Sequence, residues 1–510
     1  MHLGTHFTFT ANRYPNQVAI VQGNRRYTYE QLDKEINRVA YSLQKLGLGK
    51  QDRVMVLLKN RIETVIIYWA VQKLGAIFTP INLRLAPDDI QHCVIDVEAK
   101  FIVFETTSAH LIKNTKFEER PILISIHEGQ GDITYSELRD RGSETFTPAS
   151  INEDDISVIL YTSGTSGKPK GVPRSHKNEY ASSMAHIVQC HYQNLDKTLG
   201  AVQIYHTMGI RSLLAMVLLN GTYVISPDFD PDEYLEMIDE EKITCLYLTP
   251  TMYHDLVYSK KAKIYTFNDL NTLVYAGAPM SFDLIKKCYE VFKPKHFINH
   301  YGSTEIYTFT TCSNIMEKPG CAGKPGLHQN IRLVVPGKNR KPSPESLVPH
   351  GEVGEIIVDM QSYEAFKGYW NRPDATRKAI REGWYYTGDL GYIDEEEDLF
   401  VVGRVDEMIL SGGENIHPQD IASVIMEHNQ VDEVVVVGEE DKRWGQMVVA
   451  YVVVKDPQVT AQELDQFCKE HKKLSNFMRP RKYVFIPKIP KTSAGKIMYR
   501  KLNSHDSEDT

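Results

Sequence analysis

Residues 161–171 form the segment with the densest set of phosphate-binding groups. They read Tyr-Thr-Ser-Gly-Thr-Ser-Gly-Lys-Pro-Lys-Gly and follow the apolar run 156–160, which predicts a buried strand. Glycines let the backbone approach an anion closely, so that successive N–H groups can point at one phosphate. The groups suited to this task are Thr162, Ser163, Gly164, Thr165, Ser166, Gly167, Lys168 and Lys170. The segment therefore predicts a phosphate cradle, with a flexible surface turn as the alternative.

Two further segments carry groups for the other parts of a nucleotide. The segment 299–305, Asn-His-Tyr-Gly-Ser-Thr-Glu, offers a flat ring for a base at Tyr301 and, at Glu305, a carboxylate of the kind that Mg²⁺ prefers. The segment 385–389, Tyr-Tyr-Thr-Gly-Asp, ends in Asp389, whose carboxylate suits a ribose diol. Alone, the first segment could equally be an ordinary strand-end turn and the second an Asx-turn, so the prediction depends on their combination.

The C-terminal part of the chain is basic. Residues 469–501 hold 11 Lys and Arg against one acidic residue, Glu470, and the glycine-containing segment 490–496 ends in Lys496. Positive charge concentrated in this way favours a polyanionic ligand. A solvated surface that balances an acidic body is the alternative, and Lys496 by itself would be an ordinary surface lysine.

Composition limits the class of protein. The 510 residues are 42% hydrophobic and carry a net charge of −8, which argues against a nucleic-acid binder because phosphate contact needs a basic face. The seven cysteines are scattered without a CxxC pair, which suits reduced thiols better than disulfides or zinc. The longest apolar runs, such as 448–454, are shorter than the roughly 20 residues that span a bilayer. With no secretion signal at the N-terminus, we expect a cytoplasmic protein.

The elements that must position these groups alternate along the first part of the chain. Thr28 and Gln31 have the spacing of a capping box, and apolar residues at intervals of three and four follow, which predicts a helix that ends near Gly47. Short apolar runs predict strands at 54–58, 76–78, 101–104, 156–161, 199–204, 222–225, 244–248 and 273–275. Strands that alternate with helices indicate parallel sheets covered by helices.

Composition changes after about residue 320 and predicts smaller parts. Pro and Gly become frequent and short strands dominate, as at 354–358 and 399–402, which is typical of an antiparallel module. The last segment, of about 100 residues, again mixes helices with strands and is long enough for a separate domain. The expected fold class is α/β. It has a large N-terminal domain of two parallel-rich sheets with a small β-rich subdomain, and a small α+β C-terminal domain.

Five motifs, taken in order, resemble those of the adenylate-forming superfamily, which contains acyl-CoA synthetases, luciferase-type enzymes and the adenylation domains of peptide synthetases. The motifs are residues 161–171, 301–305, 387–389, 403–406 with 411–415, and 495–496. The resemblance covers residues 5 to 502. The C-terminal part is most similar to 4-chlorobenzoate:CoA ligases, through the segments 403–418, 443–446 and 477–481.

The resemblance implies a two-step reaction that uses ATP, Mg²⁺ and coenzyme A. A carboxylate attacks the α-phosphate of Mg-ATP to give an acyl-adenylate and pyrophosphate, and a thiol then displaces AMP. Two anions must meet in the first step, so positive charge and oriented N–H groups are required. The implied domains are residues 1–403 for ATP and the acid, a hinge at 404–406 with Asp406 as its pivot, and a mobile C-terminal domain at 407–510.

The resemblance also implies roles for single residues. The catalytic set would be Lys496, which bridges the carboxylate and the phosphate, Glu305, and His206 at the gate of the acyl pocket. Thr162 and Glu305 would bind Mg²⁺. Beyond the 161–171 segment, the implied nucleotide contacts are Gly277, Ala278, Pro279, His300, Tyr301, Gly302, Thr304, Asp389 and Arg404. The implied CoA contacts are Arg84, Gly412, Gly413, Glu414, Trp444, Phe477 and Arg479.

The acyl pocket decides which acid is used. By resemblance its walls are 206–209, Tyr247, Ala276, Gly302 and 306–308, where bulky Tyr and Met side chains favour a compact or aromatic acid over a long chain. The chain departs from the family before the gate, where Val-Gln-Ile at 202–204 replaces a usual proline. Three alternatives remain open: a medium-chain fatty acyl-CoA synthetase, an enzyme that loads the phosphopantetheine of a carrier protein, and a nucleotide-sensing protein with a dead site. We expect a monomer or a homodimer.

Overall fold

The computed structural model describes residues 2–502, except 114, 116, 118, 128–130, 163–167, 338–341, 406, 412–413, 417, 473, 492–496 and 498–501. The side chains of residues 410, 414 and 415 are also outside the description. The chain forms two compact units. The larger unit contains Met1–Asn330 and Asp359–Gly383, and the smaller contains Ile331–Val358 and Trp384–Thr510. The division at 404–406 stays a prediction.

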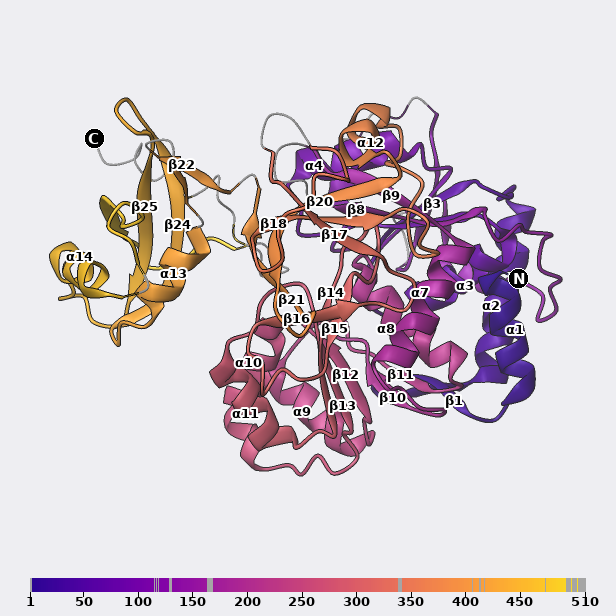
Figure 1. Cartoon of the computed structure of the whole chain (residues 1–510). Helices are drawn as coiled ribbons and strands as arrows, with labels where there is room; N and C mark the ends of the chain where they lie inside the picture. The colour runs from indigo at the N-terminus through magenta and orange to yellow at the C-terminus, as the bar shows by residue number, and fades with distance from the viewer. Residues whose placement is uncertain are drawn as a thin grey trace. The chain divides into compact units, whose positions relative to one another are not determined.

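The first sheet of the larger unit is mostly parallel and has the strand order β7-β6-β5-β3-β4-β8-β9. Figure 1 labels three of its strands, β3, β8 and β9. Its strands are β3 (Arg53–Leu57), β4 (Ile77–Pro80), β5 (Phe101–Phe104), β6 (Ile122–Ser125), β7 (Ile133–Thr134), β8 (Ile156–Thr162) and β9 (Lys170–Ser175). Only the last pair, β8 and β9, is antiparallel, and its final partners are Thr162 and Lys170. The ladder therefore holds the two ends of the predicted phosphate segment side by side.

The second sheet of the larger unit runs β16-β15-β14-β13-β12-β10-β11-β1-β2. Its strands are β1 (Val18–Gln22), β2 (Arg25–Thr28), β10 (Lys197–Leu199), β11 (Thr222–Val224), β12 (Cys245–Leu248), β13 (Thr272–Tyr275), β14 (His296–Tyr301), β15 (Thr310–Cys312) and β16 (Cys321–Pro325). From β14 to β1 the pairs are parallel. Ligands of such sheets bind beyond the carboxyl ends of the strands, and the 299–305 segment lies at that edge.

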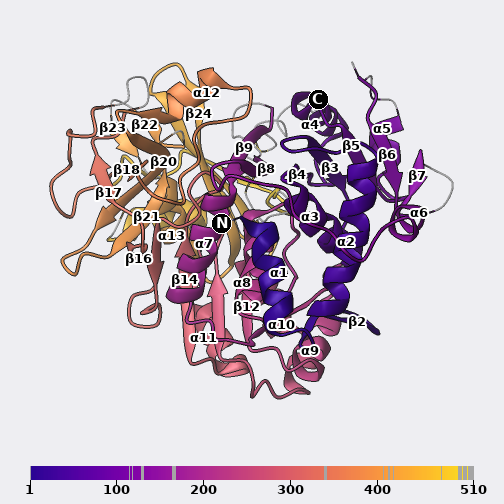
Figure 2. The same ribbon diagram turned by 90° about the vertical axis from the view of Figure 1, so that its right-hand side faces the viewer.

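Helices pack on both sheets of this unit. They are α1 (Leu3–Arg13), α2 (Tyr29–Lys45), α3 (Ile62–Leu74), α4 (Pro87–Val97), α5 (His110–Lys113), α6 (Tyr135–Asp140), α7 (His176–Gln189), α8 (Thr207–Leu218), α9 (Pro231–Glu240), α10 (Pro250–Tyr258), α11 (Phe282–Phe292) and α12 (Pro373–Ala379), with η1 (Lys260–Lys263) and the short strand β19 (Ile380–Arg381). All 13 residues of α3 are buried. Figure 2 shows α1, α2 and α3 together, and the largest apolar core joins them to both sheets.

Local signals for the second helix are confirmed. Gln31 N donates to Thr28 Oγ1 at 3.3 Å, and Thr28 N donates to Gln31 Oε1 at 2.9 Å, so the predicted capping box is present. Gly47, just past the end of the helix, has φ +93°, the left-handed conformation that glycine adopts without strain. None of the helices in the described part of the chain combines the length and apolarity that a membrane crossing requires.

The strand predicted at 199–204 has the wrong bounds, because β10 ends at Leu199 and residues 200–204 form no strand. The side chain of Asn60 binds this backbone instead: its amide donates to the carbonyls of Gly200 at 2.8 Å and Val202 at 3.0 Å. Its oxygen accepts a hydrogen bond from Ile204 N at 3.0 Å. Because one buried asparagine satisfies three main-chain groups, the segment needs no strand partner there. This arrangement holds the chain that leads into α8 without the proline that is usual in the family.

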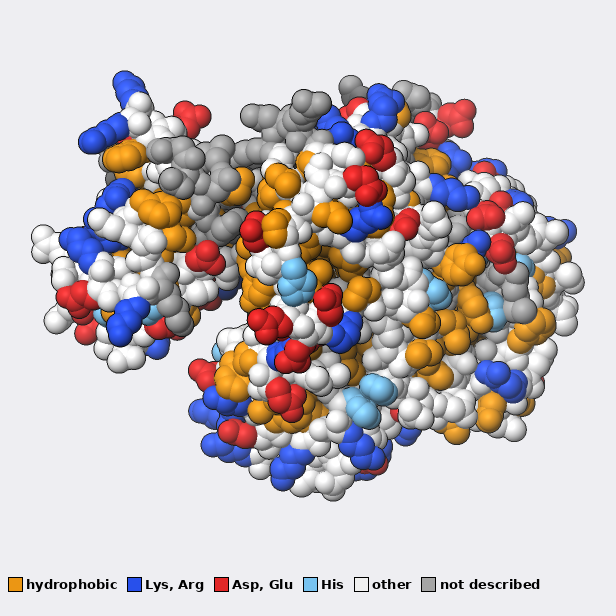
Figure 3. All heavy atoms as spheres, viewed as in Figure 1, with side chains coloured by type: hydrophobic (Ala, Val, Ile, Leu, Met, Phe, Trp, Pro, Cys, Tyr) orange, Lys and Arg blue, Asp and Glu red, His pale blue; other side chains and the backbone are white. Residues whose placement is uncertain are grey.

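The outer side of α7 carries an apolar stripe. Tyr180, Met184 and Val188 follow one another at intervals of four residues, and Val188 is 55% exposed. The ring of His6 stacks on Tyr180 with centroids 4.7 Å apart. Figure 3 shows hydrophobic side chains gathered on the face of the molecule over α7 and α8.

The number of subunits, one or two, stays a prediction.

The smaller unit holds an antiparallel module and a five-stranded sheet. The module has the order β17-β18-β20-β21, with β17 (Ile331–Val334), β18 (Gly354–Asp359), β20 (Trp384–Ile393) and β21 (Leu399–Arg404). The sheet has the order β23-β22-β25-β24 with β26 beside β25, and its strands are β22 (Ile409–Ser411), β23 (Glu414–Ile416), β24 (Val431–Asp441), β25 (Gly445–Val454) and β26 (Lys482–Phe485). Helices α13 (Pro418–Met426) and α14 (Ala461–Glu470) share an apolar core with it. The predicted α/β class is confirmed.

Candidate active site

The acidic segment after β14 forms a tight turn. The N–H of Ser303 donates to the Ile306 carbonyl at 3.0 Å, and the N–H of Ile306 donates to Ser303 Oγ at 3.2 Å. Residue 302 must be glycine in this turn, because a Cβ there would lie 1.8 Å from the carbonyl oxygen of Tyr307. The turn therefore fixes the backbone that carries Thr304 and Glu305.

Glu305 is held by Tyr369 and lies close to the strand pair that flanks the predicted phosphate segment. Its Oε1 accepts a hydrogen bond from the Tyr369 hydroxyl at 2.7 Å, and the residue is only 8% exposed. The ammonium of Lys170 lies 4.4 Å from the centre of the Tyr369 ring, within cation–π range. Thr162 is the β8 partner of Lys170. Through Tyr369, the structure thus brings Thr162, Lys170 and Glu305 together.

The donors at this place fit Mg²⁺. The Glu305 carboxylate and the Thr162 hydroxyl are oxygen donors, and Mg²⁺ in nucleotide sites needs one or two carboxylates besides the substrate phosphates. The described residues contain no group of three or more His, Cys, Asp or Glu that converges on a metal. Lys168 points elsewhere, with Nζ 3.3 Å from Asp89 Oδ1 of α4.

The predicted adenine edge follows β13. This strand is the parallel neighbour of β14, with Tyr275 paired to Asn299, so residues 277–279 lie beside the end of β14. Gly277 has φ +88°, which favours glycine at the turn. Gly277 and Pro279 are exposed, while Tyr301 is half-buried. The edge is therefore open to a flat ring.

His300 points into a buried polar cluster. Its Nδ1 lies 3.3 Å from the Tyr247 hydroxyl and its Nε2 lies 3.2 Å from Thr308 Oγ1. The Tyr307 hydroxyl lies 3.0 Å from Nδ1 of His186. Burial lowers the pKa of His300 to about 4 and raises the pKa of Tyr247, so both side chains are neutral at neutral pH. The cluster contains predicted walls of the acyl pocket, and the contact of His300 with adenine stays a prediction.

The ring of His206 lies beside Tyr205, and the charge of Arg84 acts on the same tyrosine. The main-chain N–H of His206, directly before α8, donates to the Gln203 carbonyl at 3.0 Å. The centroid of the His206 ring lies 4.6 Å from that of the Tyr205 ring. Burial raises the pKa of Tyr205, and the positive charge of Arg84 acts against that rise. The positive charge of Arg84 thus acts on the neighbour of the predicted gate, and the contact of Arg84 with CoA stays a prediction.

The two predicted ribose residues, Asp389 and Arg404, form an ion pair in the smaller unit. They are partners in the β20–β21 ladder, and Arg404 Nη1 donates to Asp389 Oδ1 at 2.5 Å. Gly388 has φ +75°, and a Cβ there would lie 2.9 Å from Arg404 Nη2. The Val405 N–H donates to the Gly388 carbonyl at 2.8 Å. Glycine suits residue 388 because any other residue would be strained at this positive φ.

The predicted CoA residues of the smaller unit differ in their surroundings. Trp444 lies on the β24–β25 hairpin, where its main-chain N–H donates to Asp441 Oδ1 at 2.8 Å. The residue is 40% exposed. Phe477 is 48% exposed. Arg479 forms an ion pair with Asp465. Two large apolar side chains are therefore accessible, while the arginine already has an acidic partner.

Several predicted residues lie outside the described part of the chain. They are Ser163, Gly164, Thr165, Ser166, Gly167, Asp406, Gly412, Gly413, Lys496 and the side chain of Glu414. Their roles stay predictions.

Sequence reasoning missed Tyr369 and a buried ion triad of Arg174, Glu179 and Arg211, whose side chains are all 0% exposed. The triad had a detectable signal. Arg211 interrupts the apolar helical segment 207–218, and a charge buried there requires a partner. Tyr369 had no such signal, since 64 residues separate it from Glu305.

Comparison with known families and proteins identifies the family. A family model described as AMP-binding enzyme matches residues 7–370, and a second, described as AMP-binding enzyme C-terminal domain, matches residues 420–496. The chain belongs to the AMP-binding enzyme family. The predicted membership of the adenylate-forming superfamily is therefore confirmed.

The relatives of this AMP-binding enzyme are CoA ligases. The chain is 31% identical to a 2-succinylbenzoate–CoA ligase of Bacillus licheniformis, with 96% of this chain and 97% of the relative covered. It is 30% identical to a 4-chlorobenzoate–CoA ligase of an Arthrobacter species (98% and 94% covered) and 30% identical to a long-chain-fatty-acid–CoA ligase of Mycobacterium tuberculosis (93% and 92%). The structure matches that of the Bacillus subtilis o-succinylbenzoate CoA synthetase with its acyl-adenylate, with a TM-score of 0.86, 27% identity and 99% of each chain covered. The predicted class of enzyme, an AMP-forming acid–thiol ligase that uses ATP and CoA, is confirmed.

Proposed function

We propose that this AMP-binding enzyme is an ATP-dependent acid:CoA ligase that acts on a compact or aromatic carboxylic acid. The observation that carries the proposal is the contact series from Thr162 through Lys170 and Tyr369 to Glu305. It gathers a hydroxyl, an ammonium and a carboxylate at the ends of the phosphate-binding segment. Hydroxyl and ammonium groups suit phosphate oxygens, and the carboxylate suits their metal ion.

In the first step, an oxygen of the acid attacks the α-phosphorus of ATP, and the bond to the bridging oxygen breaks to release pyrophosphate. Thr304 binds the α-phosphate through its hydroxyl, Lys496 offsets the charge between the carboxylate and that phosphate, and the 161–171 segment holds the β- and γ-phosphates. The Asp389–Arg404 pair binds the ribose. When bound, Mg²⁺ neutralises phosphate charge, with Glu305 and Thr162 as its protein ligands.

In the second step, the sulfur of CoA attacks the acyl carbon and AMP leaves. We propose Asp406 as the pivot of a hinge motion between two poses of the C-terminal part. Arg84, Trp444, Phe477 and Arg479 then bind the CoA nucleotide, and residues 412–414 line the path of the pantetheine. Trp444 and Phe477 support this role because both large apolar side chains are exposed.

The walls of the predicted acyl pocket favour a compact acid. Tyr247 and Tyr307 are each 1% exposed and, with His300, fill the space behind the 302–308 turn. Their neutral state at neutral pH suits an uncharged acyl group with polar atoms. Two relatives named for succinylbenzoate and chlorobenzoate support an aromatic acid.

A fatty acid is the second candidate, because one relative is named for long-chain fatty acids. A separate carrier protein is the alternative thiol partner. Neither alternative changes the chemistry of adenylation. An assay of adenylation therefore identifies the preferred acid, and an assay of thioester formation identifies the thiol acceptor.

The test is acid-dependent exchange of labelled pyrophosphate into ATP across a panel of benzoates, cinnamates, branched short acids, octanoate and palmitate. Benzoates or cinnamates should exchange fastest, and CoA should then give a thioester at micromolar to millimolar concentrations. A higher kcat/KM with octanoate or palmitate would instead establish the fatty acid. Exchange without any CoA saturation would point to a carrier protein.

A further inference from the structure

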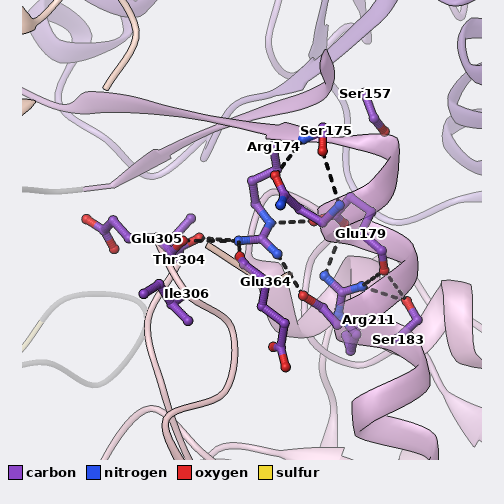
Figure 4. Close-up of polar contacts among 12 residues, drawn as sticks. Ser157, Arg174, Ser175, Glu179, Ser183, Arg211, Thr304, Glu305, Ile306 and Glu364 are labelled. Atoms are coloured by element: carbon purple, nitrogen blue, oxygen red, sulfur yellow. Dashed lines mark hydrogen bonds and ion pairs between the residues drawn. The ribbon is translucent and has the colours of Figure 1, made fainter. Parts of the chain in front are cut away.

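Two arginines and a glutamate form an ion triad that is closed to solvent. Glu179 of α7 lies between Arg174 of β9 and Arg211 of α8 (Figure 4), and all three side chains are 0% exposed. Arg174 Nε donates to Glu179 Oε1, and Arg211 Nη2 donates to Oε2 at 3.1 Å. Burial raises the pKa of this carboxyl, but the two guanidiniums outweigh burial and hold the pKa below its ordinary value. The triad is therefore charged.

Stability alone is a poor reason for such a triad. Removing charges from water is costly, and apolar side chains of similar size often stabilise a core equally well. One guanidinium would also suffice to pair with the single carboxylate of Glu179. The contacts of Arg174 on its other side suggest a different role.

Arg174 binds the turn that carries the predicted nucleotide ligands. Its Nη1 donates to the carbonyls of Thr304 at 2.9 Å, Glu305 at 3.4 Å and Glu364 at 3.2 Å. Its Nη2 donates to Ser182 Oγ at 2.8 Å. Figure 4 shows these carbonyls on the side of the guanidinium opposite Glu179. The backbone of the turn is thus held from the protein interior, where no nucleotide can reach.

A second segment is tied to the same turn. The Phe366 N–H donates to the Glu305 carbonyl at 2.9 Å, and Ile306 forms a β-bridge with Ala365. The segment continues to Tyr369, which binds the Glu305 carboxylate. Arg174 therefore joins the backbone of Glu305 to the segment that also orients its side chain.

We propose that Arg174 is a positioning residue of the nucleotide site. Glu179 and Ser182 fix its guanidinium, and the guanidinium fixes the carbonyls of Thr304 and Glu305, so that the hydroxyl of one and the carboxylate of the other meet the α-phosphate and its metal ion. The planar fork of arginine can serve a carboxylate, several carbonyls and a hydroxyl together, which the single ammonium of lysine cannot do. The inference rests on the proposed function, because that function assigns Thr304 and Glu305 their ligands.

The structure provides a matched pair of variants. Arg174→Met and Arg211→Met each remove one buried guanidinium and leave Glu179 in a one-to-one ion pair. Arg211 donates instead to the Glu179 carbonyl at 2.7 Å and to Ser183 Oγ at 2.6 Å, and it lies 4.6 Å from the Tyr307 ring centre. Its loss should act on the acyl side.

The experiment measures acid-dependent ATP–pyrophosphate exchange as a function of Mg²⁺ and of acid, together with Tm. Arg174→Met should lower kcat at least about tenfold and raise the Mg²⁺ concentration for half-maximal rate several-fold, because misplaced ligands lose binding geometry. Arg211→Met should raise the apparent KM of the acid and leave the Mg²⁺ requirement within about twofold. Equal changes in Mg²⁺ requirement for the two variants would overturn the proposal.

A gentler variant keeps the test decisive if the Met variants fold poorly. Arg174→Lys retains the charge opposite Glu179, so it should recover Tm relative to Arg174→Met while the Mg²⁺ requirement stays raised. A Lys variant with wild-type Mg²⁺ dependence would assign Arg174 to stability alone and overturn the proposal.

Calorimetric binding of Mg-ATP separates this proposal from the proposed function. A wild-type protein that binds Mg-ATP but exchanges with no acid would overturn the ligase, while weaker Mg-ATP binding by Arg174→Met than by Arg211→Met would still support the positioning role. Equal binding by both variants would overturn that role whatever the exchange result. A wild-type protein that binds no Mg-ATP would overturn both.

Discussion

The hydroxyl of Tyr369 donates a hydrogen bond of 2.7 Å to the carboxylate of Glu305 from 64 residues further along the chain. The Lys170 ammonium sits 4.4 Å from the centre of the same ring. One tyrosine therefore links the predicted metal ligand to the strand that leaves the phosphate segment. The hydrogen bond uses one oxygen of the carboxylate, Oε1, so it can orient Glu305 while Oε2 binds the predicted metal ion.

Tyr369→Phe should impair adenylation without unfolding the protein. A hydrogen bond to a charged group contributes about 1.5–3 kcal/mol, so exchange should fall roughly 10- to 100-fold and the Mg²⁺ requirement should rise. Tyr363→Phe is the matched control, since Tyr363 lies in the same segment but is 56% exposed. Pyrophosphate exchange and Tm measure both effects. Wild-type exchange by Tyr369→Phe would show that Glu305 needs no orientation from this ring.

Lys496→Ala should separate the two half-reactions. If this ammonium offsets the repulsion between the carboxylate and the α-phosphate, exchange should fall by at least about 10²-fold, while thioester formation from supplied acyl-adenylate should change much less. Lys491→Ala is the control, because Lys491 lies nearby in sequence and pairs with Glu433 at 2.7 Å. Parallel loss of both half-reactions would contradict separate poses for the two steps.

Asp389→Ala should weaken ATP binding selectively. In the wild type, Arg404 Nη1 lies 2.5 Å from Asp389 Oδ1. The variant lacks the carboxylate assigned to the ribose hydroxyls, so the KM for ATP should rise about tenfold while the KM for the acid stays the same. Glu345→Ala breaks a pair of similar length in the same unit, to Arg332 at 2.6 Å, and serves as the control. A rise in the KM for the acid as well would assign Asp389 to the packing of the smaller unit.

The sequence predicted the elements and missed their cross-links. Local signals sufficed for the capped helix α2 and for strands such as β5 and β8, because capping and apolar runs depend on neighbouring residues. The segment 199–204 has the apolar pattern of a strand, yet Asn60 binds its backbone from 140 residues away in the chain. No local pattern can reveal such a partner.

The same distinction holds for the site. Glycine, hydroxyl and acidic residues in ordered motifs led to the predictions for Thr162, Glu305 and Asp389, whose roles stay predictions. The strand ladders pair Asp389 with Arg404 and Thr162 with Lys170. The residues that orient them, Tyr369 and Arg174, come from other segments and act through contacts set by the tertiary fold. Motifs therefore supply the predicted ligands of the substrate, while packing decides which residues hold those side chains in place.

The buried histidines predict that stability falls on mild acidification. Burial lowers the pKa of His300 to about 4 and that of His176 to about 3, and it holds the pKa of His186 well below its ordinary value. In the unfolded chain each imidazole titrates near about 6.5. Between these two pKa values the unfolded state binds more protons than the folded state, so the free energy of unfolding decreases as the pH falls. Below the folded-state pKa both states bind the proton, and the decrease from that histidine is complete.

His300 alone should contribute up to about 3 kcal/mol of this loss, about 2 kcal/mol of it by pH 5. The Glu179 carboxyl has a lowered pKa, so the stability that it contributes is lost only below about pH 4.5. Glu179 therefore does not add to the decrease that the histidines cause between about pH 6.5 and pH 5. Urea unfolding midpoints at pH 7.5, 6 and 5 measure the slope, which His300→Gln should flatten and His254→Gln, at a 58% exposed side chain, should leave unchanged. If His300→Gln keeps the wild-type slope, the imidazole takes up its proton inside the folded protein, and the neutral pocket wall assigned to it is incorrect.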